Sequence, residues 1–169
     1  MKTLETNRLV IREVEFDDAP FMLDLLNQPS FIQFIGDRGV KTLEDARNYI
    51  EERALASYEK NGFGPFAVVL KSRRDVIGIV SLLDRDELDD VDLGFAFHPD
   101  FWRQGFASEA STAVMDFAFS ELGLERLIAA TQNDNIGSIR TLEKLGFAQD
   151  GLVRLEKDGP DLLLYAYER

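Results

Sequence analysis

Apolar positions along the chain recur with two spacings, one typical of strands and one typical of helices. The run from Leu9 to Val14 is rich in β-branched residues and predicts the first strand. Asp17 is the predicted N-cap of a helix that ends near Asn27, because apolar side chains follow it at helical spacing. A second helix is expected from a capping-box-like start at Thr42 to about Lys60, where an Asn-Gly pair stops it.

The segment Phe31–Gly36, which connects these two helices, is unusually apolar for a connection. We interpret it as part of the core or as the wall of a substrate pocket, in preference to a strand. Apolar residues beside a cleft and apolar residues in a core give the same pattern, so both interpretations stay open.

Shorter elements fill the second half of the chain. A helix with one apolar face follows the loop that ends at Ala107. Another helix is capped by Asn135 and ends at Gly146, where Phe147 is placed to complete a Schellman motif. The element order β-α-α-β-β-β-α-β-α-β-β predicts one α/β (α+β) domain over residues 1–169, with flanking helices on a mixed, mostly antiparallel sheet. Further strands are expected at 66–70, 76–82, 91–97 and 126–131, with a C-terminal hairpin of 148–155 and 162–167.

Composition narrows the chemistry more than it narrows the fold. The chain has no cysteine and one histidine, His98, which excludes thiolate zinc sites, a cysteine nucleophile and two-histidine metal sites. The acidic run 84–90 lacks the ligand spacing of a calcium loop and is expected to be a solvated hairpin loop, so we expect no metal. No run approaches the roughly 18 apolar residues of a membrane span, and the N-terminus lacks a signal-peptide pattern. We therefore expect a cytoplasmic protein with no membrane partner.

The net charge is −12, from 31 acidic and 19 basic residues. Phosphate repulsion would oppose binding to DNA or RNA, so we expect no nucleic-acid partner. The same charge is compatible with a cationic substrate such as an amine, and acidic surfaces also favour solubility. Solubility is sufficient to explain most of these residues.

One stretch, from Val91 to Ala113, combines a strand, a break at His98-Pro99, a glycine-bearing loop and a helix. Such a loop directs backbone N–H groups toward one point, and the helix behind it adds unpaired donors and the positive end of its dipole. The arrangement suits a phosphate or pyrophosphate, although an ordinary strand-to-helix connection has the same pattern. Neither GxxxxGK[ST] nor GxGxxG occurs, so Walker-type and dinucleotide loops are excluded.

Three motifs, in the right order along the chain, resemble the GNAT superfamily of N-acetyltransferases and most closely its RimJ/RimL-type branch. The stretch Trp102–Ala110, WRQGFASEA, is similar to the acetyl-CoA loop W-G-x-G-Y-A-T-E-A of that branch. The stretch Asn133–Phe147 is similar to its second motif, N-x-x-S followed further on by G-F. The opening Thr6–Arg12, TNRLVIR, resembles its T-x-R-L-x-L-R start. Arg103 stands where the branch commonly has Gly, which either alters the folding of the loop or adds a cation near the pyrophosphate.

The resemblance implies that backbone amides of this loop hold the pyrophosphate of acetyl-CoA, which is the expected co-substrate. The pantetheine would lie between the strands Val91–Phe97 and Arg126–Thr131, which splay apart to admit it, and Gly94 would allow a bulge there. The cofactor-binding residues implied in this way are Phe95, Ala96, Phe97, Arg103, Gln104, Gly105, Phe106, Ala107, Ser108, Asn133, Asn135 and Ser138.

The predicted catalytic residues are Ser138, which the resemblance implies, and Asp92, which lies on the central strand. Ser138 matches the position where the family places a hydroxyl near the CoA sulfur, and we predict that it donates a proton to the thiolate. A water is the alternative donor, and a first-turn helix serine needs no catalytic explanation. A backbone N–H near Phe95–Phe97 is expected to stabilise the oxyanion. Asp92 and Glu109 are the candidate bases, although each is more simply explained as a structural or solvated carboxylate.

The resemblance thus implies an enzyme that transfers acetyl from acetyl-CoA to a primary amine by direct attack in a ternary complex. The acceptor is expected to be a small molecule or a peptide or protein N-terminus. Residues near Phe31–Gly39 and the C-terminal hairpin, with Tyr165 and Tyr167 if they do not simply pack, are expected to line its pocket. The alternative function is a non-catalytic acyl-CoA-binding sensor or regulatory module. The family allows a monomer or a homodimer.

Overall fold

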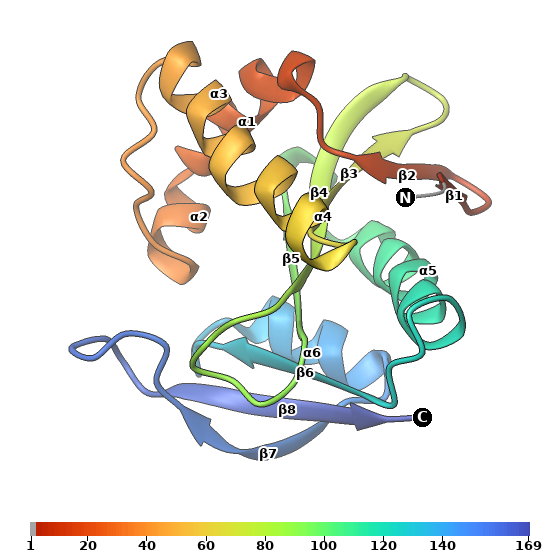
Figure 1. Ribbon diagram of the computed structural model, residues 1–169, viewed down its shortest axis with the longest axis vertical. Coiled ribbons are helices and arrows are strands. Elements are labelled where there is room, and N and C mark those ends of the chain that lie inside the picture. The colour runs from red at the N-terminus through yellow and green to blue at the C-terminus, as the bar shows by residue number, and fades with distance from the viewer. Residues whose placement is uncertain (1–2) are drawn as a thin grey trace.

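An eight-stranded sheet runs through the molecule in the computed structural model, which describes residues 3–169 (Figure 1). The strands lie in the order β1-β2-β3-β4-β5-β6-β8-β7, and β5 with β6 is the one parallel pair among the described strands. The mixed, mostly antiparallel sheet that the sequence predicts is therefore confirmed. The strands are β1 (Leu4–Glu5), β2 (Leu9–Glu13), β3 (Pro65–Leu70), β4 (Asp75–Leu83), β5 (Asp92–Phe97), β6 (Arg126–Thr131), β7 (Ala148–Val153) and β8 (Leu162–Glu168).

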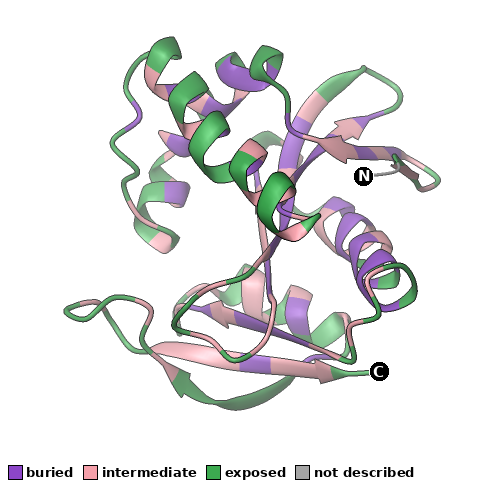
Figure 2. Cartoon of the chain, in the orientation of Figure 1, coloured by how far each residue is buried: buried purple, intermediate pink, exposed green. Residues whose placement is uncertain are grey.

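Helices cover both faces of the first half of the sheet. Strand β3 shows this division, because Phe66 and Val68 join the core under α5, whereas Ala67 faces the core under α1 and α3. Figure 2 shows buried residues along the side of α5 that meets the sheet, while the edge strand β7 is exposed for most of its length. The α-helices are α1 (Ala19–Leu26), α2 (Pro29–Phe34), α3 (Leu43–Ile50), α4 (Ala56–Asn61), α5 (Phe106–Ser120) and α6 (Ile136–Lys144).

Several helix boundaries follow the predicted caps. The Thr42 hydroxyl accepts the N–H of Asp45 at 3.0 Å, and Asp45 accepts the N–H of Thr42, so the capping box is confirmed. A π-helical turn, Glu51–Leu55, joins α3 to α4, and Gly62 ends α4 with a φ of +76°. At the end of α6, the N–H of Phe147 donates to the carbonyl of Leu142, which confirms the Schellman motif.

The expected cap of the first helix is wrong, whereas the interpretation of Phe31–Gly36 as core or pocket wall in preference to a strand is confirmed, because Phe31 is buried. Asp17 is not the cap of α1, because a 3-10 turn (Phe16–Asp18) precedes the helix and Asp18 accepts the N–H of Glu15 at 2.8 Å. Asp18 is buried and forms a bidentate pair with Arg12 at 2.8 and 2.9 Å, which fixes this turn on β2. The apolar segment that starts at Phe31 is largely helical, as α2, and Pro29 opens this helix at its first position.

The sheet opens between β5 and β6. Strand β5 pairs with β4 in unbroken register from Phe97 to Asp92, but it pairs with β6 at one position, Asp92 with Ile128. Beyond Asp92 the two strands diverge, so the splayed sheet that the family resemblance implies is confirmed. The bulge expected at Gly94 is wrong, because the register with β4 continues across it and Gly94 pairs with Ser81.

Candidate functional site

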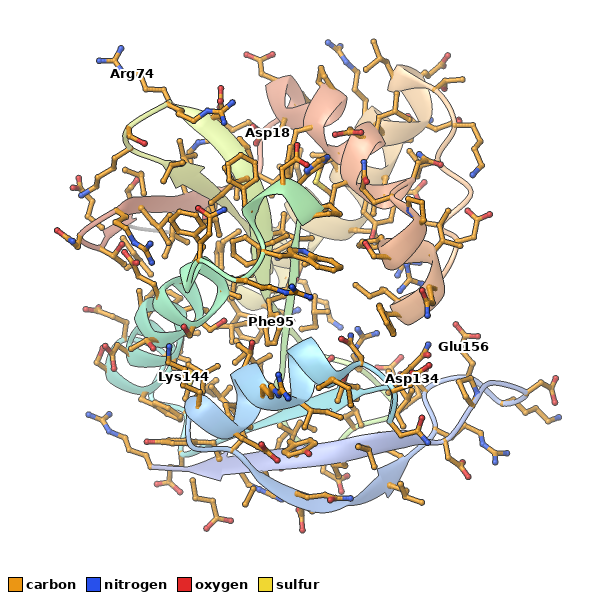
Figure 3. All side chains as sticks on the ribbon, turned by 180° about the vertical axis from the view of Figure 1, so that it is seen from behind. Asp18, Arg74, Phe95, Asp134, Lys144 and Glu156 are labelled. Carbon is orange, nitrogen blue, oxygen red and sulfur yellow. The ribbon has the colours of Figure 1, made fainter. Side chains whose placement is uncertain are left out.

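A cavity of about 640 Å³ lies where β5 and β6 diverge. Figure 3 places Phe95 of β5 beside α6, with Asp134 and Lys144 near the two ends of that helix. One end of the cavity, here called the loop end, is formed by Arg103 and residues 105–108 with Arg140 and Lys144 of α6. The opposite end, here called the α2 end, is formed by Leu25 of α1 with Phe31, Phe34 and Ile35.

The N-terminus of α5 provides the loop end with backbone donors. Gly105 is the N-cap of α5 with a φ of +80°, a conformation that favours glycine, and it supplies no capping side chain. The first intrahelical bond runs from the N–H of Glu109 to the carbonyl of Gly105 at 3.0 Å. The three N–H groups before it, from Phe106 to Ser108, therefore face the cavity end without helical partners. Together with the helix dipole they form a site suited to an anion.

Arg103 adopts a φ of +60°. Among the described residues other than glycine, Arg74 is the one other residue with a positive φ. The left-handed conformation costs a non-glycine residue about 1 kcal/mol. The loop is therefore folded as glycine would fold it, and the Arg103 side chain is added to the cavity wall. Of the two effects that the sequence left open, the structure therefore shows the added cation and not an altered loop.

Arg8 holds this loop from behind. Its Nε pairs with Glu109 at 2.7 Å, its Nη1 donates to the carbonyl of Gln104 at 2.9 Å, and its guanidinium lies 4.3 Å from the centre of the Phe106 ring. Thr6 donates to Glu109 at 2.6 Å. Burial alone would raise the pKa of Glu109, but the hydrogen bonds from Thr6 and Arg8 outweigh it and lower that pKa. Glu109 lies outside the cavity lining, so its place is structural.

Helix α6 forms the side of the cavity that faces β5. Asn135 caps it by accepting the N–H of Ser138 at 3.2 Å. Both residues line the cavity, and the Ser138 hydroxyl has no hydrogen-bond partner in the part of the chain that the structure describes. A half-buried hydroxyl in this position is available to a ligand.

The charge of the cavity is opposite to that of the chain. Three cations, Arg103, Arg140 and Lys144, and one carboxylate, Asp134, are among the described residues that line it, in a chain of net charge −12. Lys144 reaches across to α5, where its Nζ lies 3.4 Å from the Ser108 hydroxyl. Lys144, an exposed charge on α6, is thus also part of the cavity wall.

The free edge of β5 presents backbone donors to the cavity. The carbonyl of Val91 accepts the N–H of Ile128 of β6, whereas the N–H of His98 donates to Ile77 of β4, both at 3.0 Å. Because backbone groups alternate along a strand, the N–H groups of Phe95 and Phe97 face the gap between β5 and β6. The indole of Trp102 donates to the carbonyl of Phe97 at 2.8 Å, which leaves that residue's N–H as the open group.

Asp92 is buried at the point where the strands diverge. Its carboxylate accepts the N–H of Ala130 on β6 and pairs with Nε of Arg85 at 2.7 Å. Burial raises the pKa of Asp92, and the contacts with Arg85 and Ala130 act against that rise. The carboxylate thus takes the place of a backbone carbonyl of β5, which the N–H of Ala130 cannot reach because the two strands have diverged there. Asp92 lies outside the cavity lining.

Most of the predicted site residues meet in this cavity. Besides Asp92, the predicted cofactor-binding residues Gln104 and Asn133 do not line it, and the side chain of Gln104 instead donates to the carbonyl of Asp100 at 3.2 Å. Tyr165 is buried in the core, Tyr167 packs on Phe119 and Phe147, and the C-terminal hairpin takes no part in the wall. The predicted residues that line the cavity are Phe95, Ala96, Phe97, Arg103, Gly105, Phe106, Ala107, Ser108, Asn135 and Ser138.

Other lining residues were not predicted. Arg140, Thr141 and Lys144 follow Gly137 at spacings of three, four and seven, which places all four on one helical face, so this signal was present in the sequence. Leu25, Gln28 and Ser30 carry no such signal, because only the tertiary fold brings the end of α1 beside β5. No described group of three or more His, Cys, Asp and Glu side chains could hold a metal ion. Within residues 3–169, no helix has the length and apolar character needed to cross a membrane.

Known proteins are similar to this chain in sequence and in fold. The family profile described as an acetyltransferase (GNAT) domain matches residues 8–148. The uncharacterized N-acetyltransferase YnaD of Bacillus subtilis (strain 168) is 30% identical over 151 residues, which cover 89% of this chain and 85% of that protein. A GNAT-family acetyltransferase structure from Bacillus anthracis has 26% identity and a TM-score of 0.82, over 99% of this chain and 98% of that chain.

The likeness in fold extends to the RimL branch. The structure of RimL, a ribosomal L7/L12 alpha-N-protein acetyltransferase in complex with coenzyme A, has a TM-score of 0.85 at 17% identity, over 99% of this chain and 98% of that chain. At this identity the similarity concerns the fold alone. The family profile and the relatives each cover most of the sequence, so this chain belongs to the GNAT family and is an acetyl-CoA-dependent N-acetyltransferase.

Proposed function

We propose that the protein transfers the acetyl group of acetyl-CoA to a primary amine that binds at the α2 end, by direct attack in a ternary complex. One observation carries the proposal: the gap between β5 and β6 opens into a single cavity, with the uncapped N-terminus of α5 at one end and α2 at the other. A long thioester whose phosphates lie at the loop end can therefore present its acetyl group beside Phe95, where an amine approaches from α2.

The loop end suits the anionic part of acetyl-CoA. The N–H groups of Phe106, Ala107 and Ser108 would bind the pyrophosphate, and Arg103, Arg140 and Lys144 supply positive charge around them. The backbone edge of β5 offers ladder positions to the pantetheine amides, in the place that a neighbouring strand would otherwise take.

The proposed reaction conserves atoms and charge without a covalent enzyme intermediate. The amine nitrogen attacks the thioester carbonyl carbon, and the oxyanion that forms is stabilised by the N–H groups of Phe95 and Phe97. The C–S bond then breaks, and the Ser138 hydroxyl donates a proton to the sulfur. The proton that the nitrogen releases restores the hydroxyl through water. The chain has no cysteine, so no thioester forms on the enzyme through that residue.

The proposal assigns Asp92 a supporting role in place of the base. Its carboxylate is buried against Arg85 and Ala130, outside the cavity lining, and Glu109 is bound by Thr6 and Arg8. An apolar α2 end lowers the pKa of a bound ammonium, because burial disfavours the charged form. Loss of a proton to water on entry then yields the neutral amine.

The test is a calorimetric titration of acetyl-CoA into the wild type and two glycine variants. Gly105→Glu places a carboxylate in the anion site, and we expect its affinity to fall by about 100-fold, because like charges at an interface cost several kcal/mol. Gly123→Glu is the control, since Gly123 has a φ of +70° and open space around it beyond the other end of α5.

The control should bind acetyl-CoA as the wild type does, because it shares the backbone strain of the Gly105 variant and not its position. A wild type that binds no acetyl-CoA, or two variants with equal affinities, would contradict the proposed site.

A further inference from the structure

Exposed apolar side chains gather at the mouth of the cavity. Seven large hydrophobic residues of the described chain are exposed, and three of them, Ile35, Trp102 and Ile136, line this cavity. Apolar groups left in water around a cavity mark a surface that a ligand covers. Ile35 directly follows α2, Trp102 lies in the loop before α5 and Ile136 is the first residue of α6, so three separate segments contribute apolar groups to the cavity.

The walls inside this opening are apolar as well. At the α2 end, Leu25 and Phe31 are buried and Phe34 is half-buried, with Phe95 of β5 among the same lining residues. Two polar side chains lie at this end: Gln28, which precedes α2, and Ser30 of α2. Both are uncharged. An acceptor at this end therefore meets aromatic and aliphatic side chains.

Helix α2 is held in place across the cavity. The side-chain amide of Gln132, at the start of the loop before α6, donates to the carbonyls of Gln33 and Phe34 at 3.1 and 3.2 Å. This bridge connects the wall of the α2 end to the side of the cavity that carries Ser138. The apolar wall is thus held in a fixed position relative to the side of the cavity that carries Ser138.

Charge is nearly absent from the α2 end. Asp134 is the one carboxylate among the described lining residues, and it is exposed to water. An exposed carboxylate contributes little to holding an ammonium group, whereas burying a second ammonium against Phe31 and Phe34 would remove its hydration without a partner. The chain's net charge of −12 attracts cations at long range, but salt screens that attraction.

We propose that the acceptor is an amine carried on an apolar or aromatic group without a second cationic centre, and that polyamines and lysine-like amines are poor acceptors. This inference rests on the proposed function and names the class of substrate that the α2 end selects.

The test compares two amines that differ by one charged group. Norleucinamide and lysinamide share an α-amine and a linear side chain, and lysinamide alone ends in an ammonium group. We expect the wild type to acetylate the α-amine of norleucinamide with a kcat/KM at least about tenfold higher, measured in 0.15 M salt. 2-Phenylethylamine and spermidine extend the same comparison to an aromatic amine and a polyamine.

A matched pair of variants locates the selection. Ile35 lines the cavity and is 42% exposed, whereas Ile32 is 38% exposed on the same segment and lies outside the lining. We expect Ile35→Glu to shift the norleucinamide-to-lysinamide ratio about tenfold toward lysinamide, and Ile32→Glu to leave it unchanged.

The outcomes separate this inference from the function on which it rests. Failure to bind acetyl-CoA in the titration described above would contradict the proposed function itself. Acetyl-CoA binding with equal or better use of lysinamide or spermidine would overturn the inference alone. The same conclusion follows if neither norleucinamide nor 2-phenylethylamine is acetylated, or if both isoleucine variants change the ratio equally.

Discussion

The two ends of the cavity use different means to bind a ligand. The loop end consists of backbone N–H groups and cations, supported by the Arg8–Glu109 pair behind the loop. The α2 end consists of apolar side chains such as Phe31 and Phe34, fixed by the single amide of Gln132. Backbone donors can recognise the same phosphate with many different side chains around them. An apolar wall is altered by any change of one of its residues, which is why we propose that selection among acceptors resides at the α2 end.

The largest effect is expected from Asp92, which supports both ends at the point where β5 and β6 part. Asp92→Ala leaves the Arg85 guanidinium and the Ala130 N–H without their partner, and we expect it to lower the free energy of unfolding by about 3 kcal/mol. Urea denaturation measures this change. Asp92→Asn, which keeps an acceptor for Ala130, should lose less.

The control is Asp89→Ala, which removes an exposed carboxylate from the preceding loop and should change stability by less than about 0.5 kcal/mol. Equal stability of Asp92→Ala and Asp89→Ala would show that the buried carboxylate does not hold the strands.

The two ends also differ in how far the sequence predicts them. Gly105, Asn135 and Gly146 occupy positions with local signals, since a left-handed cap or an N-cap requires a small set of residues. The backbone part of the loop end, residues 105–108, was therefore predicted, whereas its cations Arg140 and Lys144 were missed. Phe31 was recognised as core or pocket wall, but its helix was missed, because an apolar run has the same pattern in either place.

Asp92 and Gln104 illustrate the limit for single site residues. The motif places Gln104 in the loop, but its carbonyl points back to Arg8 and not into the cavity. A carboxylate on a central strand suggested a base, whereas the burial of Asp92 against Arg85 depends on the loop before β5, which has no sequence signal. The sequence pattern predicts which helix, strand or loop contains a residue. The direction in which its side chain points is decided by tertiary packing.

The second effect tests the chemistry that lies between the two ends. Ser138→Ala removes the proposed proton donor, and we expect kcat to fall by about 100-fold, with the affinity for acetyl-CoA nearly unchanged. Thr141→Val is the control, because the Thr141 hydroxyl also lines the cavity but already donates to the carbonyl of Gly137 at 2.9 Å. Steady-state kinetics at saturating acetyl-CoA distinguish them. A similar small loss in both variants would point to water as the donor.

A third test removes two of the positive charges at the loop end. The double variant Arg140→Gln/Lys144→Gln should raise the KM for acetyl-CoA about tenfold at low salt, and the difference from the wild type should shrink as salt increases. The control is Arg154→Gln/Lys157→Gln on the β7–β8 connection, which changes the net charge equally and lies outside the cavity. Equal effects of both double variants would assign the loss to net charge alone.

The smallest effect concerns the support behind the loop end, Glu109. The pKa of Glu109 is lowered in the folded protein, since the hydrogen bonds from Thr6 and Arg8 outweigh the effect of burial. A group with a lowered folded pKa stabilises the fold fully above its unfolded pKa of about 4.3, and that stabilisation is lost as the pH falls through the lower folded value.

Glu109→Gln should therefore cost about 1 kcal/mol of unfolding free energy at pH 7, because one hydrogen-bonded charge is lost while an acceptor remains. The difference from the wild type should begin to close as the pH falls through the unfolded pKa of about 4.3, and it should vanish only below the lowered folded pKa, where the wild-type carboxylate is neutral in both states. Urea denaturation between pH 7 and 3 measures it, with Glu121→Gln, an exposed position just beyond the other end of α5, as the control. A difference that stays constant or widens toward low pH would mean that the charge of Glu109 does not hold Arg8, and that shape alone positions the loop end.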